Sequence, residues 1–267
     1  MRTLAITSGK GGVGKSQLTA NLSIALAKAG KRTVAFDGDL GLANLDILLG
    51  ISAEFTLQHV VAEQKTLDEV LTEGPGGIGF VAGGSAIHSL LHAGPKRMGT
   101  FLSQLEKLGE KTDYLVIDTS AGIDSKVMTF LTSADDVILV ATPEPTSITD
   151  AYAVAKMLFR KRPDAPISVL VNMVSSPDEG KVVYNALQTV VQQFLDKDLT
   201  YLGYVRGGAE VGLAGRTRSP FLLASPQCTP SMDVRMLAAH ILAAHQEESR
   251  GIAARLLDGM DENRLAA

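Results

Sequence analysis

The chain has 267 residues, of which 45% are hydrophobic and 20% charged, which is typical of a globular protein with one large, well-buried core. The net charge of −4 gives no general attraction to nucleic acid or anionic lipid, although a local basic patch would still allow such contacts. A single cysteine, Cys228, excludes an intramolecular disulfide, and no apolar run approaches the ~20 residues of a membrane-spanning helix, so we expect a cytoplasmic protein.

The first residues predict a strand, a glycine-rich loop and a helix in that order. Residues 3–8 suit a short strand, and residues 9–16 satisfy the phosphate-loop pattern G-x-x-x-x-G-K-[ST]. Gly30 stands where a helix C-cap glycine belongs, and the residues before it share one apolar helix face: Leu18, Leu22, Ala25, Leu26 and Ala29. The loop therefore has the context that a nucleotide-binding loop requires.

The binding of a triphosphate and its Mg²⁺ ion would explain each residue type in this loop. Successive backbone N–H groups and a helix N-terminus offer fixed positive dipoles to a triphosphate, and glycines let the backbone close on the phosphates. Lys15 is expected to reach the β- and γ-phosphates, and the Ser16 hydroxyl to ligate Mg²⁺. Lys10 is a second lysine in the loop, and it is either an exposed lysine without a partner or a cation for the triphosphate of a second subunit.

The rest of the chain alternates between strand-like and helix-like segments. Apolar, β-branched runs predict strands at 33–36, 78–82, 114–118, 137–141, 167–172 and 202–205. Helical patterns cover 56–62, 67–71, 101–108, 147–159 and 179–194. Continuous apolar strands indicate a parallel sheet covered on both faces. We predict a doubly wound, mostly parallel α/β sheet of the P-loop NTPase class, with one domain over 1–245 and a tail at 246–267.

Polar residues follow several of these strands, at the edge where such sheets bind ligands. Asp118 looks like a Walker B carboxylate that holds a water on Mg²⁺; the alternative is a cap of the next turn. Asp39 is the candidate that orients the attacking water. Asp37, two residues earlier, is expected to have a structural role.

Residues 10–16 resemble the deviant Walker A motif of the MinD/ParA family of ATPases. Residues 37–46 are similar to the second motif of that family, and residues 118–123 to its Walker B region. Residues 144–152 and 172–180 look particularly like the FlhG/FleN branch of flagellar-number regulators. The resemblance extends from the first strand to about residue 245.

This resemblance implies an ATP-dependent dimer switch. Two subunits sandwich two ATP molecules, Lys10 crosses to the partner's phosphates, Asp39 activates the water, and Asn172 contacts adenine. Hydrolysis of ATP to ADP is expected to be slow and to depend on the dimer, with Asp39, Lys10 and Lys15 as catalytic residues. Mg²⁺ is expected at Ser16, Asp39 and Asp118, the carboxylates acting through water. The nucleotide-binding set is Gly9, Lys10, Gly11, Gly12, Val13, Gly14, Lys15, Ser16, Gln17 and Asn172.

The resemblance also suggests partners. A flagellar GTPase, a component of the flagellar switch or a transcription regulator would fit the flagellar branch. The alternatives are a MinD-type regulator of the division site and a ParA-type ATPase that partitions DNA or cargo. DNA binding would need a basic face, for which the candidates are Lys156, Arg160, Lys161 and Arg162, or Arg206, Arg216 and Arg218.

The C-terminal region carries two apolar stripes. The first, within residues 234–242, is expected to pack on the sheet. The second comprises Ile252, Ala253, Leu256, Leu257 and Met260. By resemblance it is a helix that attaches peripherally to the inner face of the cell membrane when the protein dimerises. The nearby acidic residues Asp258, Asp261 and Glu262 instead favour a docked or frayed helix.

Overall fold

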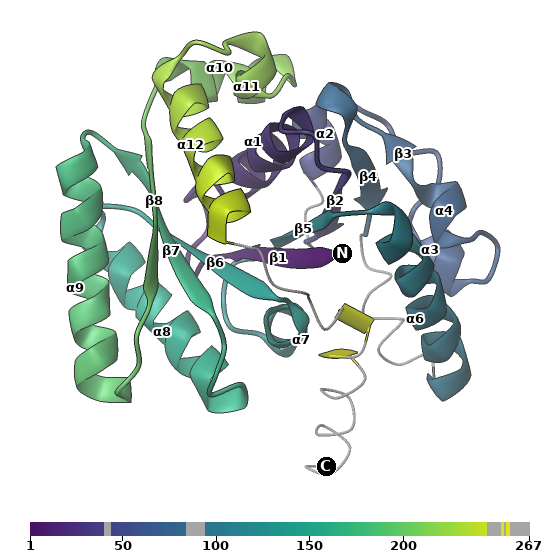
Figure 1. The fold of residues 1–267 in the computed structure, drawn as a ribbon, viewed down its shortest axis with the longest axis horizontal. Coiled ribbons are helices and arrows are strands. Elements are labelled where there is room, and N and C mark those ends of the chain that lie inside the picture. Colours follow the sequence, from purple (N-terminus) through teal and green to yellow (C-terminus); the bar gives the residue numbers. More distant parts are fainter. Residues whose placement is uncertain (40–43, 84–93, 245–251, 254, 257–267) are drawn as a thin grey trace.

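The computed structural model describes residues 1–39, 44–83, 94–244, 252, 253, 255 and 256. Its centre is an eight-stranded sheet with the order β3-β4-β2-β5-β1-β6-β7-β8 (Figure 1). Every pair of neighbouring strands is parallel except β3 and β4. The strands are β1 (Arg2–Thr7), β2 (Thr33–Gly38), β3 (Thr72–Glu73), β4 (Gly79–Ala82), β5 (Tyr114–Thr119), β6 (Asp136–Ala141), β7 (Ile167–Val174) and β8 (Thr200–Arg206).

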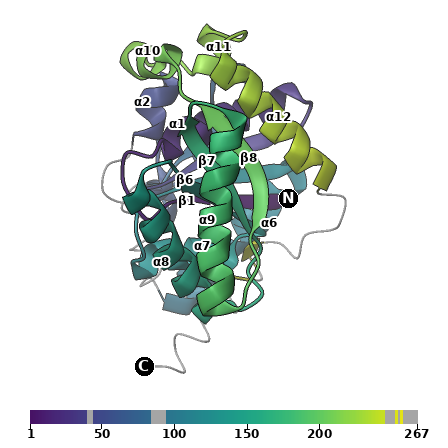
Figure 2. The ribbon, with the colours of Figure 1, turned by 90° about the vertical axis from the view of Figure 1, so that its left-hand side faces the viewer.

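Helices cover both faces of this sheet (Figures 1 and 2), which confirms the doubly wound fold. They are α1 (Lys15–Lys28), α2 (Leu45–Leu49), α3 (Leu57–Val61), α4 (Leu67–Val70), α6 (Gly94–Lys111), α7 (Ser125–Ser133), α8 (Pro145–Lys161), α9 (Pro177–Leu195), α10 (Ala209–Thr217), α11 (Phe221–Ala224) and α12 (Thr229–Ala244), with a 3-10 turn at Pro75–Gly77.

Successive residues of a central strand point to opposite faces of the sheet and pack into different hydrophobic clusters. Leu4 and Ile6 pack with α1, α11 and α12 on one face, whereas Ala5 packs with α7, α8 and α9 on the other. A third cluster under α3, α4 and α6 includes Phe36 and Ile117. Burial on both faces is why these strands read as continuous apolar runs.

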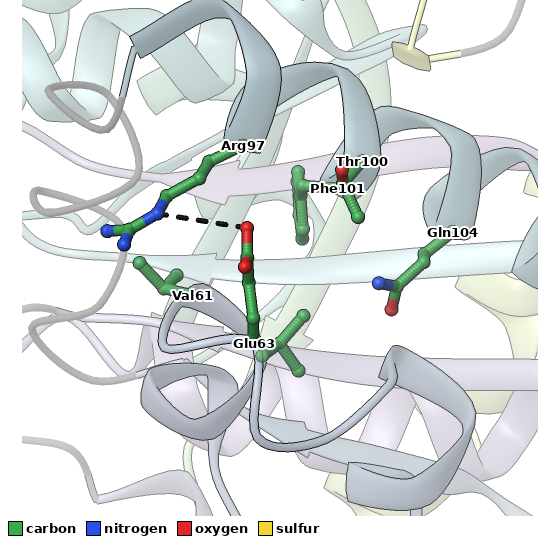
Figure 3. A pocket seen from close by; sticks show the side chains of 7 residues that line it. Val61, Glu63, Arg97, Thr100, Phe101 and Gln104 are labelled. Carbon is green, nitrogen blue, oxygen red and sulfur yellow. Dashed lines mark ion pairs between the residues drawn. The ribbon is translucent and has the colours of Figure 1, made fainter.

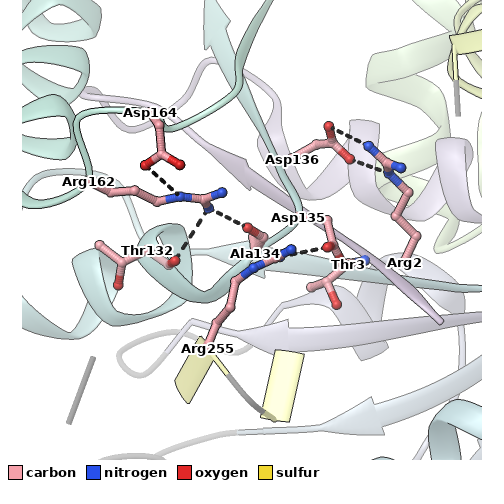
Figure 4. A network of polar contacts seen from close by, with 9 residues as sticks. All are labelled: Arg2, Thr3, Thr132, Ala134, Asp135, Asp136, Arg162, Asp164 and Arg255. Atoms are coloured by element: carbon pink, nitrogen blue, oxygen red, sulfur yellow. Dashed lines mark hydrogen bonds and ion pairs between the residues drawn. The ribbon is translucent and has the colours of Figure 1, made fainter. Parts of the chain in front are cut away.

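Part of the C-terminal tail belongs to the third cluster. Ile252, Ala253 and Leu256 are buried there among residues of α6 and α7, and Figure 1 places this segment between those helices. Arg255 forms an ion pair with Asp135 at 2.6 Å, and Asp135 also accepts the Thr3 N–H at 2.8 Å (Figure 4). Leu257 and Met260, the rest of the second stripe, lie outside the described residues. The described part of that stripe is docked on the body of the protein.

The ion pair belongs to a wider polar network at the amino-terminal ends of β1 and β6. Arg2 forms a double contact with Asp136, and Arg162 donates to the Ala134 carbonyl at 2.7 Å (Figure 4). This edge of the sheet is opposite to the edge that carries the glycine-rich loop.

Candidate functional site

The glycine-rich loop joins β1 to α1, as the sequence predicts. Gly12 and Gly14 have φ values of 80° and 91°, which residues with a Cβ rarely adopt. A Cβ at Gly11 or Gly12 would meet nothing within 4 Å, so the space above the loop is open. A Cβ at Gly9 would overlap the backbone of Asp150 in α8. The loop is therefore packed on one side and open to a ligand on the other.

Lys15 lies in the interior of the loop and Lys10 at its rim. The Lys15 side chain donates to the Ser8 hydroxyl at 3.0 Å, and the residue is only 9% exposed. Burial lowers its pKa, an effect that Asp118 and Asp39 oppose. Lys10 is half-exposed and pairs with Glu144 of its own chain, and it also donates to the Thr146 hydroxyl at 3.3 Å. The alternative that Lys10 is an exposed lysine without a partner is therefore wrong, because Lys10 has these two partners within its own chain.

The carboxylates lie beside Lys15 at the ends of β2 and β5. Asp118 accepts hydrogen bonds from the Ser16 and Thr19 hydroxyls, the latter at 3.2 Å. Its pKa is raised to about 6 because it is buried. Asp37 is its register neighbour, and burial raises the pKa of Asp37 to about 7. Both carboxyl groups therefore lie in a region from which water is largely excluded, and this disfavours their ionised forms.

Asp39 and Asp37 have different surroundings. Asp39 accepts the Ser120 hydroxyl at 2.9 Å. Asp37 accepts the backbone N–H of Asp39 at 3.0 Å and that of Leu45, the first residue of α2, at 3.3 Å. Asp37 thus orders the chain on either side of residues 40–43, which lie outside the described residues, in agreement with its expected structural role.

The ends of several strands meet at the loop. Gly122, after β5, donates its N–H to the Ser8 carbonyl at 2.9 Å. Glu144, after β6, contacts Lys10, and Asn172 in β7 donates to the Val13 carbonyl at 2.8 Å. Asn172, which the resemblance assigns to adenine, therefore touches the loop itself. The loop and the predicted polar residues form one site.

Sequence reasoning missed the hydroxyl groups of this site: Ser8, Thr19, Ser120 and Thr146. Ser8 stands next to the loop motif and Ser120 lies within the 118–123 segment, which is the signal that could have found them. Thr19 lies one helical turn beyond Lys15, and its hydroxyl also donates to the Lys15 carbonyl at 3.0 Å.

A small hollow between α3 and α6 is separate from this site. Glu63 and Arg97 form an ion pair at 3.8 Å in it, and Phe101 and Gln104 also line it (Figure 3). None of its lining residues belongs to the phosphate loop, and its two charges satisfy each other, so it offers no comparable chemistry. Over the described part of the chain, no cluster of three or more His, Cys, Asp or Glu could hold a metal by itself. No described helix is long and apolar enough to cross a membrane.

The ParA family model, described as NUBPL iron-transfer P-loop NTPase, matches residues 1–242. The chain belongs to the ParA/MinD family of P-loop NTPases. Its relatives include the antiactivator FleN of Pseudomonas aeruginosa, 38% identical over 90% of this chain and 86% of FleN. The flagellum site-determining protein YlxH of Helicobacter pylori is 33% identical over 90% of this chain and 81% of YlxH.

Among solved structures, MinD of Pyrococcus horikoshii complexed with Mg-ADP is similar with a TM-score of 0.72 and 26% identity, covering 93% of this chain and 99% of that one. The expected fold class and family are confirmed by these similarities. The roles of the individual site residues remain predictions.

Proposed function

We propose that this chain is an ATP-dependent, dimerising switch that regulates the number or placement of flagella. The observation that carries the proposal is the similarity to FleN, an antiactivator, and to YlxH, a flagellum site-determining protein, over most of both chains. The FlhG/FleN-like segments at 144–152 and 172–180 support the same branch. A transcription regulator is the partner that best suits an antiactivator-like protein; a flagellar GTPase and a switch component are the other candidates.

The proposed ligand is Mg-ATP, and the residues at the loop fit it. The space above Gly11 and Gly12 would take phosphate oxygens, and the buried Lys15 ammonium group, which here donates to the Ser8 hydroxyl, would reach them. Ser16 and Asp118, already in contact, would hold the metal, with Asp118 and Asp39 acting through water. Mg²⁺, when bound, supplies positive charge to the phosphates and stabilises the ionised form of the buried Asp118. Gly9, Val13 and Gln17 complete the proposed nucleotide contacts.

In the proposed hydrolysis, Asp39 orients water for attack on the γ-phosphate. The Ser120 hydroxyl donates to Oδ1 of the Asp39 carboxylate at 2.9 Å and helps to fix its position at the end of β2. Lys10 is proposed to leave Glu144 and to stabilise the phosphates of a second subunit. Both residues of the Lys10–Glu144 pair are solvent-exposed, so the exchange of partners has a small energetic cost. Because Lys10 would come from a second subunit, turnover is expected to require the dimer, and the family resemblance implies that it is slow.

The alternative of DNA partitioning has less support. Two of its candidate cations are engaged within the chain: Arg206 forms a bidentate pair with Asp233, and Arg162 donates to the Ala134 carbonyl. The remaining candidates, on α8, on α10 and directly after α10, are exposed: Lys156, Arg160, Lys161, Arg216 and Arg218. A MinD-type role at the division site uses the same dimer switch and differs only in the partner.

Deletion of the gene, followed by counting flagella per cell, tests the flagellar assignment. We expect the number or position of flagella to change and the parent gene to restore it. A gene carrying Lys15→Ala should fail to restore it, whereas Lys31→Ala, at an exposed position outside the site, should succeed. Unchanged flagella in the deletion strain would reject the flagellar role, and division and plasmid-loss assays on the same strain would examine the alternatives.

A further inference from the structure

The carboxyl end of β7 holds the phosphate loop directly. Asn172 is buried, and its Nδ2 atom donates to the Val13 carbonyl at 2.8 Å. A Cβ at Gly14 would lie 2.5 Å from the same nitrogen, so the amide rests against the left-handed Gly14 turn. Because the Val13 oxygen can only accept a hydrogen bond, chemistry determines that the nitrogen of the Asn172 amide faces the loop.

An irregularity in the strand accompanies this contact. The register between β7 and β8 shifts between Asn172 and Val174, and Met173 has a φ of 61°. A left-handed residue with a side chain is unfavourable inside a strand. Met173 is nevertheless 47% exposed, and its terminal methyl group would be 3.6 Å from a Cβ at Gly14. Backbone strain of this kind concentrates at functional positions, and here it lies next to the contact between Asn172 and the loop.

The two polar atoms of the Asn172 amide are used differently. Its nitrogen is bonded to the loop, whereas in the part of the chain that the structure describes its oxygen makes no hydrogen bond. An amide oxygen is an acceptor that suits the exocyclic amine of adenine. One side chain can therefore contact the base and hold the loop that binds the phosphates.

We propose that Asn172 is a positioning residue for the phosphate loop, in addition to its proposed contact with adenine. By holding the Val13 carbonyl, it keeps the adjoining Gly14 turn in the shape that presents N–H groups to phosphate. The register shift at Met173, with its left-handed backbone conformation, is what directs the Asn172 side chain toward the loop; we call it the Met173 bulge. This inference rests on the proposed function, and it predicts that Asn172 affects the binding of a ligand that has phosphates and no base.

Calorimetric titration of the wild-type chain and Asn172→Ala with Mg-ATP, magnesium tripolyphosphate and adenosine tests this. Tripolyphosphate probes the loop alone and adenosine the base site alone. We expect Asn172→Ala to weaken tripolyphosphate binding about five- to tenfold, the effect of one lost hydrogen bond, and to weaken ATP binding by more. If tripolyphosphate binds equally well to both proteins while ATP binding weakens, Asn172 acts on the base only and the inference is wrong. Failure of the wild-type chain to bind either ATP or tripolyphosphate would instead reject the proposed nucleotide site.

Amide hydrogen exchange of residues 11–16 without any ligand provides a second measurement. The loop amides should exchange faster in Asn172→Ala, and unchanged exchange would also overturn the inference. Met173→Val and Met173→Gly serve as a matched pair if Asn172→Ala fails to fold. A β-branched residue opposes the left-handed conformation and glycine permits it. Met173→Val should therefore weaken tripolyphosphate binding more than Met173→Gly, and equal effects would contradict the role of the bulge.

Discussion

Two lysines in one loop occupy different environments, and this difference predicts different effects of mutation. Lys15 is buried with Ser8, whereas Lys10 pairs with Glu144 at the surface. We expect Lys15→Ala to weaken ATP binding about 100-fold or more, because charge-assisted contacts to phosphate are lost. Lys10→Ala should leave the affinity for ATP nearly unchanged and impair ATP-dependent dimer formation. Calorimetry measures the first effect and light scattering after size exclusion the second.

Glu144→Ala is the matched control for Lys10. It removes the partner of Lys10 within the chain and leaves the lysine in place, so dimer formation should persist. Dimer formation by Lys10→Ala equal to that of the parent would refute the proposed action of Lys10 across the subunit boundary.

At the scale of elements, the tail segment that contains Leu256 is part of the folded body. Leu256 is 9% exposed in the cluster that also contains Ile252 and residues of α6. Leu256→Ala should lower the free energy of unfolding by about 2 kcal/mol, since a buried leucine is truncated. Leu213 on α10 is 50% exposed, and Leu213→Ala should cost less than about 0.5 kcal/mol. Urea unfolding compares the two variants.

Equal effects of the two leucine substitutions would show that the tail is not held in solution. The apolar stripe would then be available to a membrane, as the resemblance implies. A larger effect at Leu256 means that peripheral membrane attachment requires release of the segment and of the Arg255–Asp135 pair.

At the scale of the whole molecule, we propose that ATP binding promotes dimer formation and that ATP hydrolysis lets the two subunits dissociate. Asp39→Ala should retain ATP binding and lose the group that orients water, so the ATP-bound dimer should accumulate. Size exclusion should show the doubled mass with ATP and the single mass with ADP. Asp68→Ala removes an exposed carboxylate of α4 that pairs with Lys111, and it should behave like the parent. An Asp39→Ala protein that stays monomeric with ATP would count against the switch.

Most of the sheet could be predicted from the sequence because parallel strands that are buried on both faces appear as continuous apolar runs. The runs at 114–118 and 137–141 end within a residue of β5 and β6. Helix α7 was missed because its nine residues, SKVMTFLTS, include several β-branched and hydroxyl residues that form helices poorly. Asp124, which accepts the N–H groups of Lys126 and Val127, was the available N-cap signal.

The loop motif, the carboxylates after the strands and the fold class were determined by the sequence alone, because they depend on local backbone geometry and on residue chemistry. Only the tertiary structure decided which groups meet. Strand β5 lies between β2 and β1, which places Asp118 beside both Asp37 and the loop. Asn172 reaches Val13 across 159 residues of chain, and the described residues of the tail stripe pack into the cluster under α3, α4 and α6. Such contacts depend on the order of strands in space and on the packing of distant segments, which no local pattern encodes.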